Sequence, residues 1–558
     1  MCKKRDDGLE YDVIIRNGKV VDGTGAPWSK LDVGISGERI VKVSPTIREK
    51  APIEIDATSL MVAPGFWDLH SHDDFVLPVK NHQDLLEGKI RQGITTQVVG
   101  NCGFSPHPCL PQFTDLMKSY TSFLDAGLTW EWTNLAEFIT FLENQGIITN
   151  VACNFGHGAI RINVMGFDPG PPTEEQMEKM KSLVEEEMKH GAFGMTVGLL
   201  YAPGMYATTT EIIELAKIVA KYGGYVGIHR RGATATFFPS TWEVVEIARK
   251  AGCPGHIHHF EAYGQETFWK IDTGIRMVEE AREILGADIT YDIFPYSGAN
   301  TTIMAIFPPW ALEGGVPKLV ERLKNPAIVE KMLHDAETYV PGWFETWGHN
   351  ILRVTPYDWI LITWCASEKN KQLEGKTLAE LGKIKGKHPF LAAAELAVEE
   401  NGAVMCVFFG SSATKEDDWR GEGIIKFLKH PYAAPVTDAI MGKARQHPAG
   451  WGTMPRVLGR YARDMKLLTI EEAVRKMTSL PAHRINCQDR GIIREGMYAD
   501  ITIFNPKTII DTATYLEAKP PKGVEYVLIN GKIVLEKGVY HKETLAGKVL
   551  KGPGYVSK

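Results

Sequence analysis

The pair His70-Ser71-His72 is the clearest candidate for chemistry in this chain. It follows the apolar run LMVAPGFWDL at residues 60–69. If that run is a strand, residues i and i+2 point to the same face, so both imidazoles enter one space at the strand's carboxyl end. Imidazole is a common metal ligand. The spacing therefore predicts the beginning of a metal site.

Further metal-competent residues stand at the ends of later β-rich runs. Cys102 follows TTQVVG, His229 ends GYVGIH, His258 and His259 lie in GHIHHF, and Asp438 closes APVTD. Each has a simpler explanation when taken alone, such as a hydrogen-bonded histidine, an inert buried thiol or a helix N-cap. In a parallel barrel, however, all strand ends meet at one face. Thiolate, imidazole and carboxylate together suit zinc, which keeps a water when its site is catalytic.

The elements that must position these residues alternate along the middle of the chain. Short β-rich runs, such as VACNFG, FGMTVG and ADITYDI, are separated by amphipathic helices, for example at 173–189 and 209–221. This alternation predicts a parallel α/β barrel, for which about 250 residues are typical. The excess must be insertion. Residues 305–356, rich in Pro, Gly and Trp, interrupt the alternation and are predicted to cover the barrel mouth as a lid.

Both ends of the chain have an antiparallel β pattern. Residues 11–55 and 491–537 contain short alternating runs with Asn-Gly turns, predicted at Asn17-Gly18 and Asn530-Gly531. We infer one small β domain built from both ends. The expected boundaries are 1–62 for its first part, 63–484 for the barrel, and 485–558 for its second part with a C-terminal tail.

Composition excludes several partners and favours an ordinary globular enzyme. The 558 residues carry a formal charge of −6 without a dense Lys/Arg stretch, so neither nucleic acid nor an acidic membrane surface is expected as a partner. No apolar signal region or run of transmembrane length is apparent, and a cytoplasmic enzyme is expected. Eight scattered cysteines predict reduced, buried thiols rather than a disulfide framework.

Several segments together resemble a known family. The motifs APGFWDLHSHDD, GITTQVVGNCGFSP, GAFGMTVGLLYAPGMYA, IHRRG and HPAGWGTMPRVLGRYARD are similar to those of the amidohydrolase superfamily, and within it to the D-aminoacylase (N-acyl-D-amino-acid deacylase) group. The resemblance extends from residue 11 to about residue 539. It implies a distorted (β/α)8 TIM barrel with a small β-sandwich domain formed from both termini, which agrees with the pattern of elements.

The resemblance also implies a ligand set. The sixth-strand histidine of the group, aligned on the glycine that closes HIHHFEAYG, falls on His259, and His258 takes a serine place; we choose His259 over His258. One tight zinc and a second, weaker position are then expected. The tight position would use Cys102, His229 and His259, and the weaker one His70, His72 and Asp438.

Other amidohydrolases bridge two metals with a carboxylated lysine from the fourth strand. The corresponding segment here, GAFGMTVG, has no lysine, and Lys189 lies before the strand. Cys102 is therefore the expected bridge or primary ligand, which argues against the hydantoinase and dihydroorotase types. Asp438 is the expected catalytic acid-base residue: it would accept the proton of the attacking water and deliver it to the departing nitrogen.

At four positions, the residues that would bind the substrate differ from those typical of the D-aminoacylase group. The usual lysine, tyrosine, serine and arginine are replaced by Glu261, Phe294, Asn300 and Ala449. A lost cation and a gained anion disfavour a carboxylate in this pocket, so the substrate is expected to present a neutral or cationic group. Two further substrate-binding candidates are Tyr201 and Arg231.

In one alternative, the substrate still presents a carboxylate to this pocket. In this case, the side chain of Glu261 turns away to pair with Arg230 or Arg231, and Lys443 or Arg445 on the loop after Asp438 supplies the missing charge.

The leading functional hypothesis is thus a zinc-dependent amidohydrolase that cleaves the C–N amide bond of a small-molecule N-acyl compound. Hydrolysis of a cyclic amide, carbamate or ester is an alternative, because the same chemistry attacks any activated carbonyl. A catalytically silent scaffold is disfavoured, since a scaffold needs none of the candidate ligands.

Overall fold

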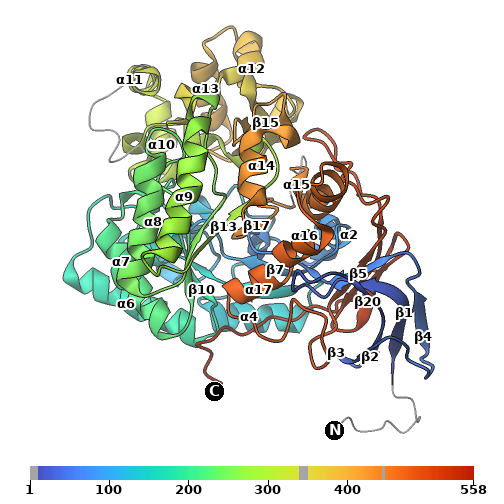
Figure 1. The fold of residues 1–558 in the computed structure, drawn as a ribbon. Coiled ribbons are helices and arrows are strands. Elements are labelled where there is room, and N and C mark those ends of the chain that lie inside the picture. The colour runs from blue at the N-terminus through green and yellow to red at the C-terminus, as the bar shows by residue number, and fades with distance from the viewer. Residues whose placement is uncertain (1–10, 339–349, 443–446, 558) are drawn as a thin grey trace.

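A barrel of parallel strands forms the centre of the computed structural model, which describes residues 11–338, 350–442 and 447–557 (Figure 1). One sheet has the order β6 (Phe66–Asp68), β7 (Ile94–Val99), β8 (Asn150–Cys153). The other runs through β9 (Phe155–Gly156), β10 (Gly194–Gly198), β11 (Tyr225–His229), β12 (Gly255–Ile257), β13 (Ile289–Ile293) and β17 (Ala433–Pro435). The segments after β17 and β6 meet where the Asp438 N–H donates to the His70 carbonyl at 3.0 Å. The predicted distorted barrel is confirmed.

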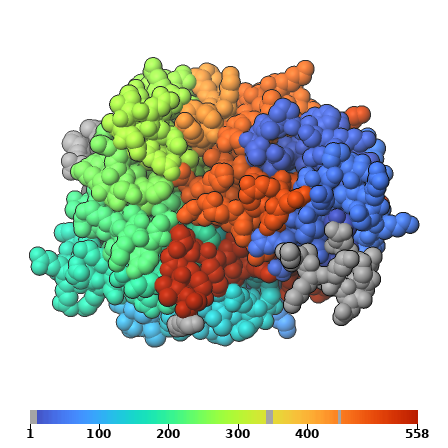
Figure 2. Space-filling model, turned by 60° about the horizontal axis from the view of Figure 1, so that its bottom comes forward, coloured from blue at the N-terminus to red at the C-terminus, as the bar shows by residue number. Residues whose placement is uncertain are grey.

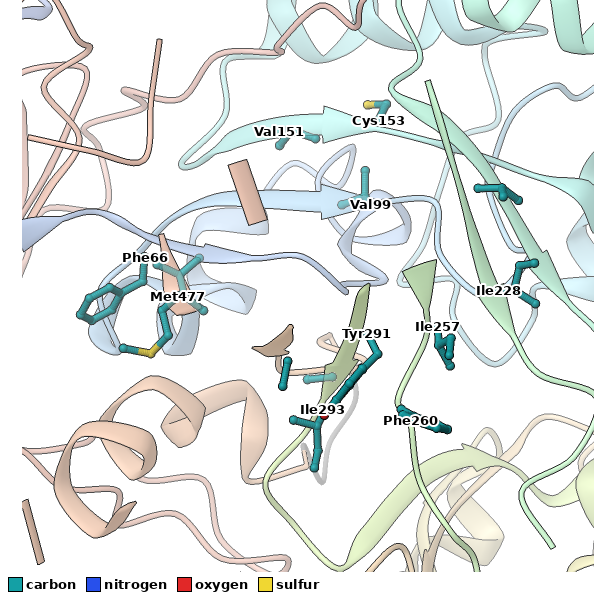
Figure 3. Packing of buried hydrophobic residues seen from close by; sticks show 14 of the residues in the cluster. Phe66, Val99, Val151, Cys153, Ile228, Ile257, Phe260, Tyr291, Ile293 and Met477 are labelled. Carbon is teal, nitrogen blue, oxygen red and sulfur yellow. The ribbon is translucent and has the colours of Figure 1, made fainter. Parts of the chain in front are cut away.

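Amphipathic helices form the outer wall. The helix predicted at 173–189 is α6 (Glu174–Lys189), which begins with a capping box between Thr173 and Gln176. The helix predicted at 209–221 is α7 (Thr209–Lys221). Further wall helices are α4 (Leu135–Gln145), α8 (Phe237–Ala251), α9 (Ile271–Glu283), α14 (Glu422–Lys429) and α16 (Ile470–Met477). Side chains of the barrel strands, among them Val99, Ile228, Ile257 and Tyr291, are fully buried in one large core (Figure 3).

Both chain ends share a nine-stranded sheet beside the barrel (Figure 1). Its N-terminal strands are β1 (Val13–Val20), β2 (Ser29–Ser36), β3 (Arg39–Ser44), β4 (Ile53–Asp56) and β5 (Met61–Pro64). Its C-terminal strands are β18 (Ile501–Phe504), β19 (Val524–Ile529), β20 (Lys532–Glu536) and β21 (Val539–Tyr540). The two sets join where β18 pairs antiparallel with β5. A β domain built from both ends is therefore confirmed, while the boundaries at 62/63 and 484/485 remain predictions.

The two Asn-Gly pairs have different roles. Asn530 and Gly531, at φ 49° and 77°, form the two-residue connection between β19 and β20, as predicted. The turn predicted at Asn17-Gly18 is wrong, because both residues lie inside β1, where the pairing with β2 shifts register. Glycine is required at position 18 by close packing: a Cβ there would lie 2.5 Å from Val62 Cγ2 on β5.

An inserted layer covers one end of the barrel (Figure 1). Its antiparallel sheet consists of β14 (Gly298–Thr302), β15 (Ile360–Cys365) and β16 (Val404–Phe409). Its helices are α10 (Val316–Leu323), α11 (Pro326–Glu337), α12 (Leu378–Lys385) and α13 (Pro389–Glu399), which share a hydrophobic core of their own. The layer extends on both sides of the insertion predicted at 305–356, of which residues 339–349 lie outside the described part of the chain.

The C-terminal tail binds the amino ends of the barrel strands, away from the candidate site. The Val151 N–H donates to the Lys548 carbonyl at 2.9 Å, and the Gly552 N–H donates to the Gly191 carbonyl at 2.8 Å. Figure 2 shows this dark red segment on the barrel's lower face. The seven cysteines within the described residues are unpaired and buried, as predicted. Among these residues, no helix combines the length and the apolar character needed to cross a membrane.

The Asn530-Gly531 connection gives a stability prediction. Gly531→Ala places a Cβ 2.1 Å from the Gly37 carbonyl oxygen at a positive φ. We expect roughly 1–2 kcal/mol of loss from the left-handed backbone and about 1–3 kcal/mol more from the collision, measured by urea unfolding. Gly496→Ala is the matched control, since its φ is 92° but nothing lies within 4 Å. Equal losses in both variants would contradict the packing argument.

Candidate metal centre

Six candidate ligands converge at the carboxyl ends of the barrel strands. Within each of two groups, the ligand atoms all lie within 4.8 Å of one another. One group is Cys102, His229 and His259, and the other is His70, His72 and Asp438. The structure thus brings together both ligand sets that the resemblance implies.

The first group lies at the ends of β7, β11 and β12. His259 Nε2 is 2.7 Å from His229 Nδ1 and 3.6 Å from Cys102 Sγ. All three residues are buried. One thiolate and two imidazoles pointing at a common space form a donor set that suits zinc.

The second group adjoins the first. Asp438 Oδ1 lies 3.2 Å from His70 Nε2 and 3.4 Å from His72 Nε2. His70 Nε2 is also 3.2 Å from Cys102 Sγ. The two groups therefore share a border at Cys102 and His70, and a pair of adjacent cations would fit them.

Three of the candidate ligands have left-handed backbone conformations. The φ angles are 52° at Cys102, 29° at His259 and 45° at Asp438. Such conformations cost of order 1–3 kcal/mol each for non-glycine residues and persist only where the surrounding structure enforces them. Each residue closely follows a strand and contributes its side chain to one of the ligand groups.

His258 also reaches the centre. Its Nδ1 lies 3.7 Å from Cys102 Sγ, and it forms a third compact group with Cys102 and His70. The His258 N–H continues the β11 pairing by donating to the Ile228 carbonyl, and its ring packs so closely that a Cβ on Gly227 would lie 2.4 Å from Nε2. Burial lowers the pKa of His258 to about 4, which keeps this imidazole neutral.

The sequence analysis missed Asp292, which lies beneath the centre on β13. Its carboxylate contacts His70 Nδ1 at 3.1 Å and His256 Nε2 at 3.0 Å, and accepts the His259 backbone N–H at 2.5 Å. Burial opposes its ionisation, but His70 and His256 hold the pKa of Asp292 well below its usual range. A charged residue inside the buried run ITYDI was the signal that could have revealed it.

The electrostatics of the centre fit a bound cation. Burial alone would raise the pKa of the Cys102 thiol, but His70 and His229 lower it well below its ordinary value. Burial likewise opposes a charge on His70, while Asp438 and Cys102 raise its pKa. The thiolate of Cys102 and the protonated form of His70 are thus favoured together. A bound zinc ion would supply the positive charge in place of the imidazole proton, and metal binding releases such protons.

A pocket opens from the centre toward the inserted layer. His229, His259 and Asp438 line its floor. The substrate-binding candidates Tyr201, Glu261, Phe294 and Asn300 also line it. Ala305 and Ile351, from the predicted lid, complete one side.

Glu261 faces this pocket and does not pair with the neighbouring guanidinium groups. Its carboxylate lies 3.3 Å from His259 Nδ1 and accepts a hydrogen bond from Ser411 Oγ. Arg230 instead donates to the Glu261 backbone carbonyl, and Arg231 binds the carboxylate of Glu243.

Arg231 lies outside the pocket lining and is held by Glu243 and by the Met205 and Ala207 carbonyls. We therefore assign it no contact with substrate. Lys443 and Arg445, the alternative source of positive charge, lie outside the described residues.

Comparison with known proteins identifies the family. An amidohydrolase family model matches residues 54–271 and 430–535. The chain belongs to the amidohydrolase family. It is 29% identical to a D-aminoacylase of Alcaligenes xylosoxydans xylosoxydans over 98% of this chain and 99% of the relative. An N-acyl-D-glutamate deacylase of the same organism is 31% identical over 94% and 93%, respectively.

A solved structure extends this similarity to the whole fold. The N-acyl-D-glutamate deacylase of Bordetella bronchiseptica, complexed with zinc and a phosphonate inhibitor, is 28% identical with a TM-score of 0.79, covering 98% of this amidohydrolase and all of that chain. The resemblance to the D-aminoacylase group is thereby confirmed. This amidohydrolase is an enzyme of the deacylase type, which hydrolyses carbon–nitrogen bonds other than peptide bonds.

Asp292→Asn tests the support beneath the centre. The amide cannot supply the negative charge that orients His70 and His256, so we expect zinc affinity to fall about 10- to 100-fold, measured by competition with a chromophoric chelator. The control is Asp288→Asn, just before β13, whose carboxylate pairs with Arg484 outside the centre. Unchanged zinc affinity in Asp292→Asn would show that the carboxylate serves only packing.

Proposed function

We propose that this protein is a zinc-dependent amidohydrolase that cleaves the amide bond of a small N-acyl compound whose amine part lacks a carboxylate. The observation that carries the proposal is the joint placement, at one barrel end, of two adjoining ligand groups and a pocket that the Glu261 carboxylate faces. The similarity to N-acyl-D-amino-acid deacylases supports the reaction type.

Zinc would be held in one tight and one weaker position. Cys102, His229 and His259 offer the tight position, because it includes a buried thiolate. His70, His72 and Asp438 offer the weaker one. We choose His259 over His258 because its Nε2 is close to His229 Nδ1 as well as to Cys102 Sγ. When bound, zinc acts as a Lewis acid that activates water and polarises the scissile carbonyl.

Asp438 is the proposed acid-base residue. It follows the last barrel strand, lines the substrate pocket and reaches both histidines of the weaker group. Burial raises the pKa of its carboxyl, but His70 and His72 lower it below the ordinary value, so the carboxylate can accept a proton. It would then transfer this proton to the departing nitrogen, because an amine anion is a very poor leaving group.

The pocket supports a neutral or cationic amine part. Glu261 places a buried negative charge where the group has a lysine, and Ser411 and His259 hold it in position. Within the described part of the chain, Asn300, in the serine place, has no hydrogen-bond partner for either its amide nitrogen or its amide oxygen. A substrate that leaves this amide unpaired would lose binding energy, so an amide or amine that bonds to Asn300 and Glu261 fits best.

Asp438→Asn tests the reaction. We expect amide hydrolysis to fall at least about 100-fold, the lower end for a general acid-base group, while the zinc held by Cys102 stays bound. Amine release from a panel of N-acyl compounds, followed by mass spectrometry, and metal analysis by atomic emission are the measurements. Asp417→Asn, an exposed acid away from the pocket, is the control. Near-normal turnover by Asp438→Asn would refute the assignment.

Substrate charge is tested with matched compounds that share one acyl group. The wild-type enzyme is expected to prefer N-acyl amines and N-acyl amino acid amides over the free N-acyl-D-amino acids. Glu261→Lys should shift the ratio of kcat/KM values toward the free acids by at least about tenfold, equivalent to 1.4 kcal/mol. Both substrates are measured with the same protein, so a lower zinc content reduces both kcat/KM values equally and leaves their ratio unchanged. A wild-type preference for the free acids would refute the proposed specificity.

A further inference from the structure

A second, apolar chamber adjoins the metal pocket. Its lining shares three residues with the pocket, namely Leu200, Tyr201 and Ala305. The remaining wall is almost entirely hydrocarbon and comes from two sources. The barrel side contributes the aromatic rings of Phe104, Tyr120, Phe123 and Phe167, and the inserted layer contributes Met304, Leu312, Gly315 and Val316.

The chamber begins at the metal ligands. The Phe104 ring lies 6.3 Å from the His72 ring and 4.9 Å from the Tyr201 ring, and Tyr201 is 5.0 Å from the His229 ring. A group that extends from a carbonyl between His72 and His229 thus meets Phe104 and Tyr201 first. The chamber is therefore reached directly from the position of the reacting carbon.

The hydroxyl groups of the chamber wall already form hydrogen bonds within the protein. The Tyr120 hydroxyl donates to the Gly103 carbonyl, and the Tyr201 hydroxyl is 3.0 Å from Thr301 Oγ1. The Thr302 hydroxyl oxygen accepts the Met304 backbone N–H. The surface left for a ligand is apolar, and burying apolar groups against it is favourable by the hydrophobic effect.

The chemistry of the reaction decides which part of the substrate enters the chamber. The departing nitrogen must face Asp438, which lines the metal pocket together with Glu261 and Asn300. The amine part then lies in that pocket. The acyl chain, which is the other substituent of the carbonyl carbon, must extend in a different direction. The chamber beyond Tyr201 is lined by apolar side chains that suit such a chain.

We propose that the chamber binds the acyl chain and that this enzyme selects N-acyl groups of several carbons over acetyl. The inference rests on the proposed amide hydrolysis and adds the class of acyl group. Each methylene that enters the chamber should raise kcat/KM by about fourfold until the space is filled.

The test uses the zinc-loaded full-length enzyme and a series of acyl chains, from acetyl to octanoyl, on one amine. Val316→Phe and Leu312→Phe fill the chamber from the inserted layer, and either should reduce the octanoyl-to-acetyl ratio of kcat/KM at least about tenfold. Ile384→Phe, on an exposed position of α12 in the same layer, should leave the ratio unchanged. Calorimetry gives a second readout: wild type should bind octanoate more tightly than acetate, and both filling variants should lose this difference.

The outcomes separate this inference from the proposed function. If N-acyl compounds are hydrolysed but kcat/KM does not rise with chain length, or if both filling variants keep the wild-type ratio, the acyl-chamber inference is wrong and the amidohydrolase remains. If no compound of any chain length is hydrolysed by the zinc-loaded enzyme, the proposed function is wrong. Octanoate binding then tests the chamber separately, and equal affinity for acetate and octanoate would overturn it too.

Discussion

The polar centre depends on the contacts that the buried carboxylate of Asp292 makes. This carboxylate contacts the imidazole of His70, just after β6, and that of His256, within β12, and it accepts a backbone N–H from the left-handed turn at His259. A buried carboxylate without a partner costs free energy. Any movement that separates Asp292 from its partners is therefore unfavourable, and this keeps the partners in place. The orientation of His70, and through it the border between the two ligand groups, follows from this contact. A partner that fixes a metal-ligating imidazole also sets which nitrogen faces the metal.

The barrel supplies the convergence that the centre requires. Its strands are parallel, so residues as distant as Cys102 and Asp438 end at one face. Cys102, His259 and Asp438 each adopt a left-handed conformation just after a strand, and their side chains lie in the two ligand groups. The barrel strands that precede these turns are buried in the large hydrophobic core, and well-packed surroundings allow costly backbone conformations to persist. The C-terminal tail binds the opposite end of the barrel, away from the six candidate metal ligands.

In the proposed function, the barrel provides the candidate ligands, and the barrel loops and the inserted layer together provide the walls that face a substrate. The ligand groups come from the barrel, whereas much of the wall around them comes from the inserted layer. Glu261 belongs to both regions, because it stands beside a candidate ligand and also faces the substrate pocket. A change at this one position affects both the charge offered to a substrate and the surroundings of His259. The helices and the sheet of the layer pack around a hydrophobic cluster that is distinct from the main barrel core.

The sequence by itself determined the order and type of the main elements and predicted the six candidate ligands that the structure brings together. The alternation of elements, the amphipathic helices at 173–189 and 209–221, and the His-x-His spacing are local properties, and local periodicity is set by backbone geometry. Only the tertiary structure decided what depends on distant neighbours. The β domain register places Asn17-Gly18 in a bulge instead of a turn, because Val62 packs against it. Asp292 joins the centre, and the Glu261 carboxylate faces the pocket instead of an arginine, because burial and pairing across strands fix where a charge can lie.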